Sequence, residues 1–116
     1  MTADLRRSLL ELHRLLLDVQ RRQVERISGR MSAAELLQAA TDDLRFSWIT
    51  ELFKPIAALD EAHHDGDDAA VERATEQIRA LLVEPAPDSG FGRRYLQVLQ
   101  DEPAVVLVHR DVTAAL

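Results

Sequence analysis

Residues 41–64, TDDLRFSWITELFKPIAALDEAHH, hold the only tryptophan of the chain and two of its three phenylalanines. Wound as an α-helix at about 100° per residue, this stretch gathers its large apolar side chains on one broad face. That face consists of Leu44, Trp48, Ile49, Leu52, Phe53, Ile56 and Leu59. We therefore predict a central helix over residues 41–64 with a buried face, in which Trp48, Leu52 and Phe53 anchor the core.

Pro55 lies inside this predicted helix. Proline lacks the backbone donor and crowds the preceding turn, so we expect either a kink or a short break near Phe53 and Lys54. The helical pattern of apolar residues continues beyond it to His63. The sequence leaves open which of the two distortions occurs.

The chain before the central stretch predicts two helices. Residues 3–28 carry leucine and valine at spacings of three and four, in two stripes that cover about half of the cylinder, with Leu16 in the core. Gly29 suits a helix end. Ser32 followed by Glu35 is a capping box, which predicts a short helix from Ala33 to about Ala40. Thr41 or Asp42 would then cap the central helix.

The chain after the central stretch predicts three more helices. Gly66 should stop the central helix, and Asp67 or Asp68 should start the next. A shorter helix is expected over residues 91–100. The final segment contains VVLV, which also suits a buried strand. Pro103 and the helical spacing of the valines that follow it favour a helix over residues 103–116.

These elements predict one all-α domain over residues 1–116, an antiparallel bundle of four main helices with one or two short extra helices. A chain of 116 residues is a common size for one domain. Because only 4% of its residues are aromatic, the core must be built mainly from aliphatic side chains.

Composition excludes several classes of function. The chain has no cysteine, so it forms no disulfide and no thiolate metal site. No apolar run is long enough to cross a bilayer, and we expect no membrane association and a cytoplasmic location. The net charge of −6 argues against nucleic-acid binding. Residues 1–30 carry seven basic and four acidic side chains, a net charge of +3, which we interpret as an ordinary solvated helix surface.

Four polar residues on apolar faces are the candidate site. His13 lies on the first helix, Asp60 and His63 on the central helix, and His109 among the valines of the last. Asp60 and His63 are three residues apart, as in the carboxylate and histidine pairs of metal-binding helical bundles. Imidazole with carboxylate would suit a divalent metal such as zinc, iron or manganese. The alternative is that each histidine has a hydrogen-bonding partner within the core.

Three other polar residues have structural expectations. Gln20 lies on the buried side of the first helix, where it would fix the register of packing. Arg45 is expected to pair with Asp60 or with an acid of another helix. Arg94, like Arg93, is expected to face solvent.

The segments FSWITELFKPIAALDE and DEPAVVLVH, together with the capping box, resemble a family of small bacterial all-helical proteins. The resemblance implies a bacterial cytosolic protein and brings with it no activity, cofactor or functional residues.

The sequence thus favours a non-enzymatic interaction or structural protein that associates with itself as a homodimer and needs no cofactor. The alternative is a bundle that binds a metal or another small ligand through His13, Asp60, His63 and His109. DNA-dependent regulation is a weaker third interpretation, because no helix-turn-helix pair is evident.

Overall fold

A computed structural model describes residues 2–116, which form six α-helices and one 3-10 turn and contain no strand. The elements are α1 (Ala3–Ser28), α2 (Ala33–Asp42), η1 (Leu44–Phe46), α3 (Ser47–His64), α4 (Asp68–Leu82), α5 (Gly90–Asp101) and α6 (Pro103–Ala115). The all-α prediction is confirmed. Residues 103–115 are helical, so the strand alternative for VVLV is excluded.

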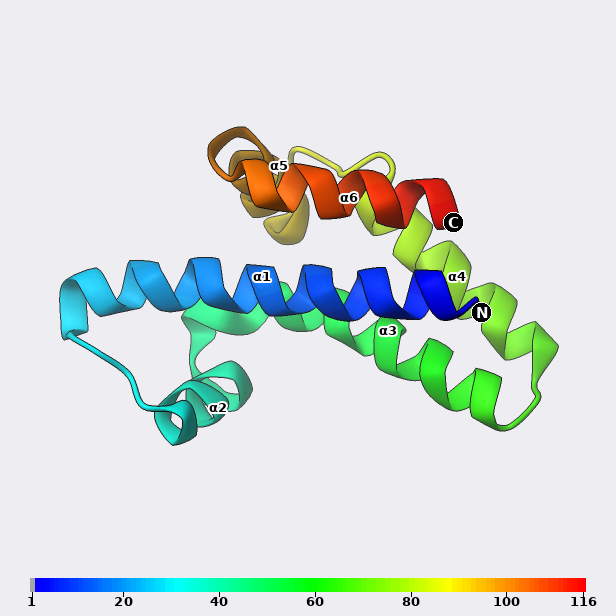
Figure 1. Cartoon of the computed structure of the whole chain (residues 1–116), viewed down its shortest axis with the longest axis horizontal. Coiled ribbons are helices and arrows are strands. Elements are labelled where there is room, and N and C mark those ends of the chain that lie inside the picture. The colour runs from blue at the N-terminus through cyan, green and yellow to red at the C-terminus, as the bar shows by residue number, and fades with distance from the viewer. Residues whose placement is uncertain (1) are drawn as a thin grey trace.

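Helix α1 runs through the middle of the molecule, with α6 along one side and α3 along the other (Figure 1). Helix α4 packs on α3, and α5 contacts both α3 and α6. Helix α2 stands apart from this group, below the C-terminal part of α1 at the lower left of Figure 1, and packs mainly on the η1 turn and α3. We call α1 and α3–α6 together the body.

The core of the body consists mainly of aliphatic side chains, with Phe46, Trp48, Phe91 and Tyr95 buried among them. Leu16, Trp48 and Leu52 are buried, as predicted. Phe53 is not: its side chain is 42% exposed, so its assignment to the core was wrong. It lies at the edge of the buried stripe of α3, where the ring of His13 covers it on one side with ring centroids 4.7 Å apart.

The central helix begins later than predicted. Helix α2 continues through Thr41 to Asp42, and Asp43 then caps the η1 turn by accepting a hydrogen bond from the backbone N–H of Arg45 at 2.9 Å. Helix α3 starts only at Ser47. The intervening turn breaks the helical phase, which leaves Leu44 85% exposed instead of buried.

The predicted local signals are otherwise present. Ser32 and Glu35 form both hydrogen bonds of the capping box, and Asp67 caps α4. Gly29 and Gly66 end their helices with positive φ angles of 84° and 69°. Helix α3 is continuous through Pro55, so of the two distortions that the sequence left open the short break is absent. The proline ring is buried, and this burial helps to offset the missing backbone hydrogen bond.

Helix α5 begins on a close contact that only glycine allows. A Cβ atom at Gly92 would overlap the carbonyl group of Ala86 in the preceding loop. The hydroxyl of Ser89 caps the same turn by accepting from the Gly92 N–H at 2.9 Å. This contact fixes the start of α5 and therefore the position of Arg94, one turn further on.

Within residues 2–116, no helix has both the length and the apolar character needed to cross a membrane.

Candidate functional site

The predicted residues Asp60 and His63 line an open groove between the first turns of α1 and the second half of α3. Its volume is about 580 Å³. Leu10, Phe53 and Ile56 supply its apolar surface, and charged or polar side chains of both helices stand around it. We call it the α1–α3 groove.

One ion pair joins the two helices at this groove. Nε of Arg6 donates to Oδ1 of Asp60 at 2.9 Å, and both side chains are about half exposed. The hydrogen bond from Arg6 holds the pKa of Asp60 below its usual value. Exposed pairs of this kind contribute little stability. The partner of Asp60 is thus Arg6, whereas Arg45, which we expected to reach an acid of another helix, pairs with the adjacent Asp43 at 2.7 Å.

The structure does not bring the four predicted residues together. His13 packs against Phe53, whereas Nδ1 of His109 is hydrogen-bonded to the hydroxyl of Tyr95 at 2.6 Å. Burial lowers the pKa of both histidines below the ordinary value. In the described part of the chain, no group of three or more His, Asp or Glu side chains is arranged to hold a metal ion.

A second candidate surface surrounds α2. This helix of ten residues contains no buried residue, although it carries two leucines. Three large apolar side chains at this end of the molecule are strongly exposed: Ile27 is 84% exposed, Leu37 is 72% exposed and Leu44 is 85% exposed. They come from the end of α1, from α2 and from η1. We call the surface that they mark the α2 end.

Next to the α2 end lies a pocket, with polar groups at its base, that sequence reasoning missed. Its volume is about 470 Å³, and Ile27 and Leu44 form part of its wall. At its base, the carbonyl oxygen of the buried Gln20 accepts from Nε1 of Trp48 at 3.0 Å and from Nη2 of Arg94 at 3.1 Å. We call it the Arg94 pocket.

The guanidinium group of Arg94 is held in one orientation. Its Nη2 also donates to Oε1 of Gln23 at 2.8 Å, and its Cζ lies 5.4 Å from the ring centroid of Trp48. Cation–π contact of this kind contributes roughly 0.5–2 kcal/mol. Arg94 was predicted to face solvent; instead it is half-buried. The signal for its position was absent from α5, because its partners lie more than 70 residues away on α1.

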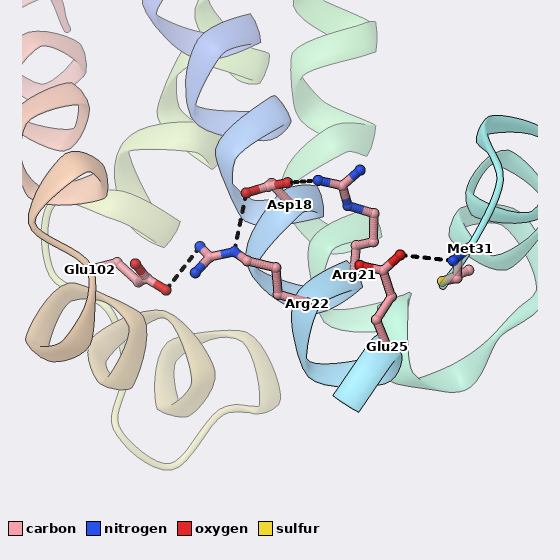
Figure 2. A network of polar contacts seen from close by, with 6 residues as sticks. All are labelled: Asp18, Arg21, Arg22, Glu25, Met31 and Glu102. Carbon is pink, nitrogen blue, oxygen red and sulfur yellow. Dashed lines mark hydrogen bonds and ion pairs between the residues drawn. The ribbon is translucent and has the colours of Figure 1, made fainter. Parts of the chain in front are cut away.

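Charged side chains in the C-terminal half of α1 bind α5 and the segment that leads into α2 (Figure 2). Asp18 pairs with Arg21 and Arg22, and Arg22 also reaches Glu102 at the α5–α6 junction, with Nη2 3.0 Å from Oε1. Nearer the end of α1, a carboxylate oxygen of Glu25 accepts from the backbone N–H of Met31 at 2.8 Å. Arg22 thus ties α5 to α1, and Glu25 ties down the segment that leads into α2.

Comparison of the chain with models of known protein families, with curated proteins and with solved structures found no match.

Proposed function

We propose that this protein is a non-enzymatic interaction protein that associates with a second copy of itself through the α2 end. The observation that carries this proposal is the exposure of Ile27, Leu37 and Leu44 around a helix with no buried residue. Single exposed apolar residues are ordinary on protein surfaces. Three of them on adjoining segments, each more than two-thirds exposed, are typical of a surface that a partner covers.

The shortness of α2 supports the same conclusion. Isolated helices of fewer than about 12–15 residues are marginal in water, and most helices in proteins are stabilised by packing of an apolar face. Helix α2 has ten residues and packs only its partly buried Leu36 and Ala39 against the core. A second copy covering Leu37 would supply the missing burial.

A symmetric dimer is the simplest closed assembly for such a surface. We further infer that α1, α3, α4 and α6 are the four main helices of an antiparallel bundle, to which α2 and α5 are added. In that architecture α2 is not needed to close the core and is available for association. The absence of cysteine and the net charge of −6 favour a cytoplasmic protein that does not bind nucleic acid.

Light scattering coupled to size-exclusion chromatography tests the proposal. The wild-type chain of 13.1 kDa should show twice its mass at high concentration. The variants Leu37→Glu and Leu44→Glu should each remain monomeric, because a buried carboxylate without a partner opposes association. Leu107→Glu on α6 is the matched control, since Leu107 is also a strongly exposed leucine but lies outside the α2 end. That variant should dimerise like the wild type. A monomeric wild type at every concentration, or equal effects of all three variants, would refute the proposal.

The α1–α3 groove favours a second candidate function, the binding of a small ligand. Its volume of about 580 Å³ falls within the range of small-molecule sites, and apolar side chains with Asp60 and His63 beside them match the usual composition of such sites. A metal ion is the other form of this candidate, because Asp60 and His63 are ligand types for divalent metals.

Elemental analysis of protein purified without a histidine tag tests whether a metal ion is bound. For an organic ligand, mass spectrometry of protein purified under non-denaturing conditions should find a bound molecule that Phe53→Asp removes. Leu107→Asp is the control for the added charge. If both measurements find nothing bound, the groove has no ligand of this kind.

A further inference from the structure

The Arg94 pocket carries positive charge that the rest of the described chain does not compensate. Its lining includes two arginines, Arg45 and Arg94, and no acidic residue. Arg45 forms an ion pair with Asp43, whereas Arg94 has no carboxylate partner within residues 2–116. The pocket therefore keeps a positive charge in a protein whose net charge is −6. This charge favours an anion as the ligand of the pocket.

The amide group of Gln20 is oriented so that its N–H groups have no partner. Nε1 of Trp48 and the guanidinium of Arg94 can only donate, so the side-chain oxygen of Gln20 must face both of them. Its Nε2 makes no hydrogen bond within the described chain, although Gln20 is only 5% exposed. Because a buried N–H group without a partner is costly, its acceptor must come from the pocket that Gln20 lines.

Gln23 and Arg94 add further donors beside Gln20. The oxygen of Gln23 accepts from Nη2 of Arg94, which leaves Nε2 of Gln23 as a second amide donor without a partner in residues 2–116. The two glutamines use both hydrogens of Nη2, so the guanidinium donors that remain are Nε and Nη1. These two cannot donate in parallel to one planar carboxylate. The pocket thus offers single hydrogen bonds from three side chains.

A phosphate group attached to an apolar molecule suits this set of donors. Its three terminal oxygens point in different directions and can accept from separate donors, and a phosphate monoester carries a charge of about −1.5 to −2 at pH 7. The wall of the pocket also includes Ile27 and Leu44, which are 84% and 85% exposed. The volume of about 470 Å³ is typical of small-molecule sites and leaves room for an organic group beside the phosphate.

We propose that the Arg94 pocket binds a phosphate monoester of a small apolar molecule. The phosphate accepts from Arg94 and from the amide nitrogens of Gln20 and Gln23, and the organic group packs on Ile27 and Leu44. The inference does not rest on self-association, because Leu37 of the α2 end does not line the pocket. Leu37→Glu should therefore bind the ligand like the wild type.

Fluorescence of Trp48 reports on the pocket directly, because Trp48 is the only tryptophan and contacts both Gln20 and Arg94. Phenyl phosphate is the probe, titrated into dilute protein, with isothermal titration calorimetry as the second measurement. Benzyl alcohol is a comparison compound without charge, phenylacetate has a planar carboxylate, and inorganic phosphate lacks the apolar group. Phenyl phosphate should bind at least about 10-fold more tightly than each of these three compounds.

Gln23→Glu is the sharpest substitution, because it replaces the amide by a carboxylate of the same shape. The carboxylate still accepts from Arg94 but neutralises it and repels phosphate, so phenyl phosphate should bind at least about 30-fold more weakly while the protein keeps its stability in urea. Gln97→Glu is the matched control, since Gln97 is an exposed glutamine of α5 outside the pocket lining. It should change the dissociation constant by less than about threefold, because solvent and salt screen the added charge.

A second pair of variants tests the cation. Arg94→Gln should weaken phenyl phosphate binding at least about 10-fold, because it removes the charge that assists the hydrogen bonds. Arg93→Gln is its control, because Arg93 is the exposed neighbour of Arg94 and is absent from the pocket lining. This variant should bind phenyl phosphate like the wild type.

The possible results separate this proposal from self-association. Absence of phenyl phosphate binding in both measurements would overturn the site and leave water as the acceptor for its donors. Equal affinities for phenyl phosphate and any of the three comparison compounds, or an unchanged affinity of Gln23→Glu, would also overturn it. A monomeric wild type that binds phenyl phosphate would refute self-association alone, and a dimeric wild type that does not bind it would refute this site alone.

Discussion

The body and helix α2 use the same residue types in opposite ways. The body has a closed core in which Leu9, Leu12, Leu16, Leu52 and Leu59 are all inaccessible to solvent, although Leu10 and Leu107 on its surface are exposed. Helix α2 has an equally regular sequence and a complete capping box, yet Leu37 is 72% exposed. The difference teaches that the capping box specifies where α2 begins, whereas burial against the core, which for α2 is limited to Leu36 and Ala39, is set by the packing of the other helices.

The largest expected effect comes from comparing two leucine truncations, one in the body and one in α2. Leu12→Ala should lower the free energy of unfolding by about 2–5 kcal/mol, because it leaves a cavity in a closed core. Leu37→Ala should change it by less than about 0.5 kcal/mol when the protein is dilute and monomeric. Urea unfolding at low protein concentration measures both. Equal losses for the two variants would mean that α2 belongs to the core.

The polar base of the Arg94 pocket should have an intermediate effect. Gln20→Leu removes the acceptor for both Trp48 and Arg94, and unpaired buried donors should cost about 1–3 kcal/mol in unfolding free energy. The exposed Gln97→Leu is the matched control and should be nearly neutral. If Gln20→Leu were also neutral in urea unfolding, the pocket would not depend on this network.

A smaller and local effect is expected at the start of α2. Ser32→Ala removes the side-chain acceptor of the capping box and should destabilise α2 by about 1 kcal/mol, whereas Ser32→Asp should keep the cap. Because α2 contributes little to the body, amide hydrogen exchange should accelerate in residues 33–42 only. Global unfolding that shifts with Ser32→Ala as strongly as local exchange would contradict this separation.

The smallest effect concerns pH and should be confined to the body. Burial lowers the pKa of His13 and His109, so the folded protein resists protonation that the unfolded chain accepts below about pH 6.5. The free energy of unfolding should therefore decrease as the pH falls from 7 to 5. His13→Gln and His109→Gln should each reduce that dependence in urea unfolding at several pH values. A free energy of unfolding that stays constant or increases as the pH falls from 7 to 5 would contradict the burial of these two rings.

Much of the fold was predictable from the sequence because its signals are local. Capping residues and apolar spacing located α1, α4 and α6 and the capping box of α2. The start of α3 was not predictable, because a single 3-10 turn interrupts a continuous apolar pattern at residues 44–46. The same turn exposes Leu44. Phe53 was misplaced for another reason: periodicity shows which side of a helix is apolar, and it does not show which part of that side a neighbour covers.

The candidate site was predicted less well. Asp60 and His63 do line a groove, but His13 and His109 have partners elsewhere. The Arg94 pocket joins α1, α3 and α5 through residues up to 74 positions apart, and no spacing within one helix indicates it. Long-range contacts of this kind require the packed structure. Gln20 was the one clue, since a polar residue on a buried face needs partners.

Hydrogen exchange of α2 at low and high protein concentration tests the proposed self-association most directly, because it observes the helix that we propose a second copy covers. Amides of residues 33–42 should exchange rapidly in dilute protein and become protected as the concentration rises, while amides of α1 and α3 remain protected throughout. Protection of α2 that is independent of concentration and equal to that of the body would contradict the account.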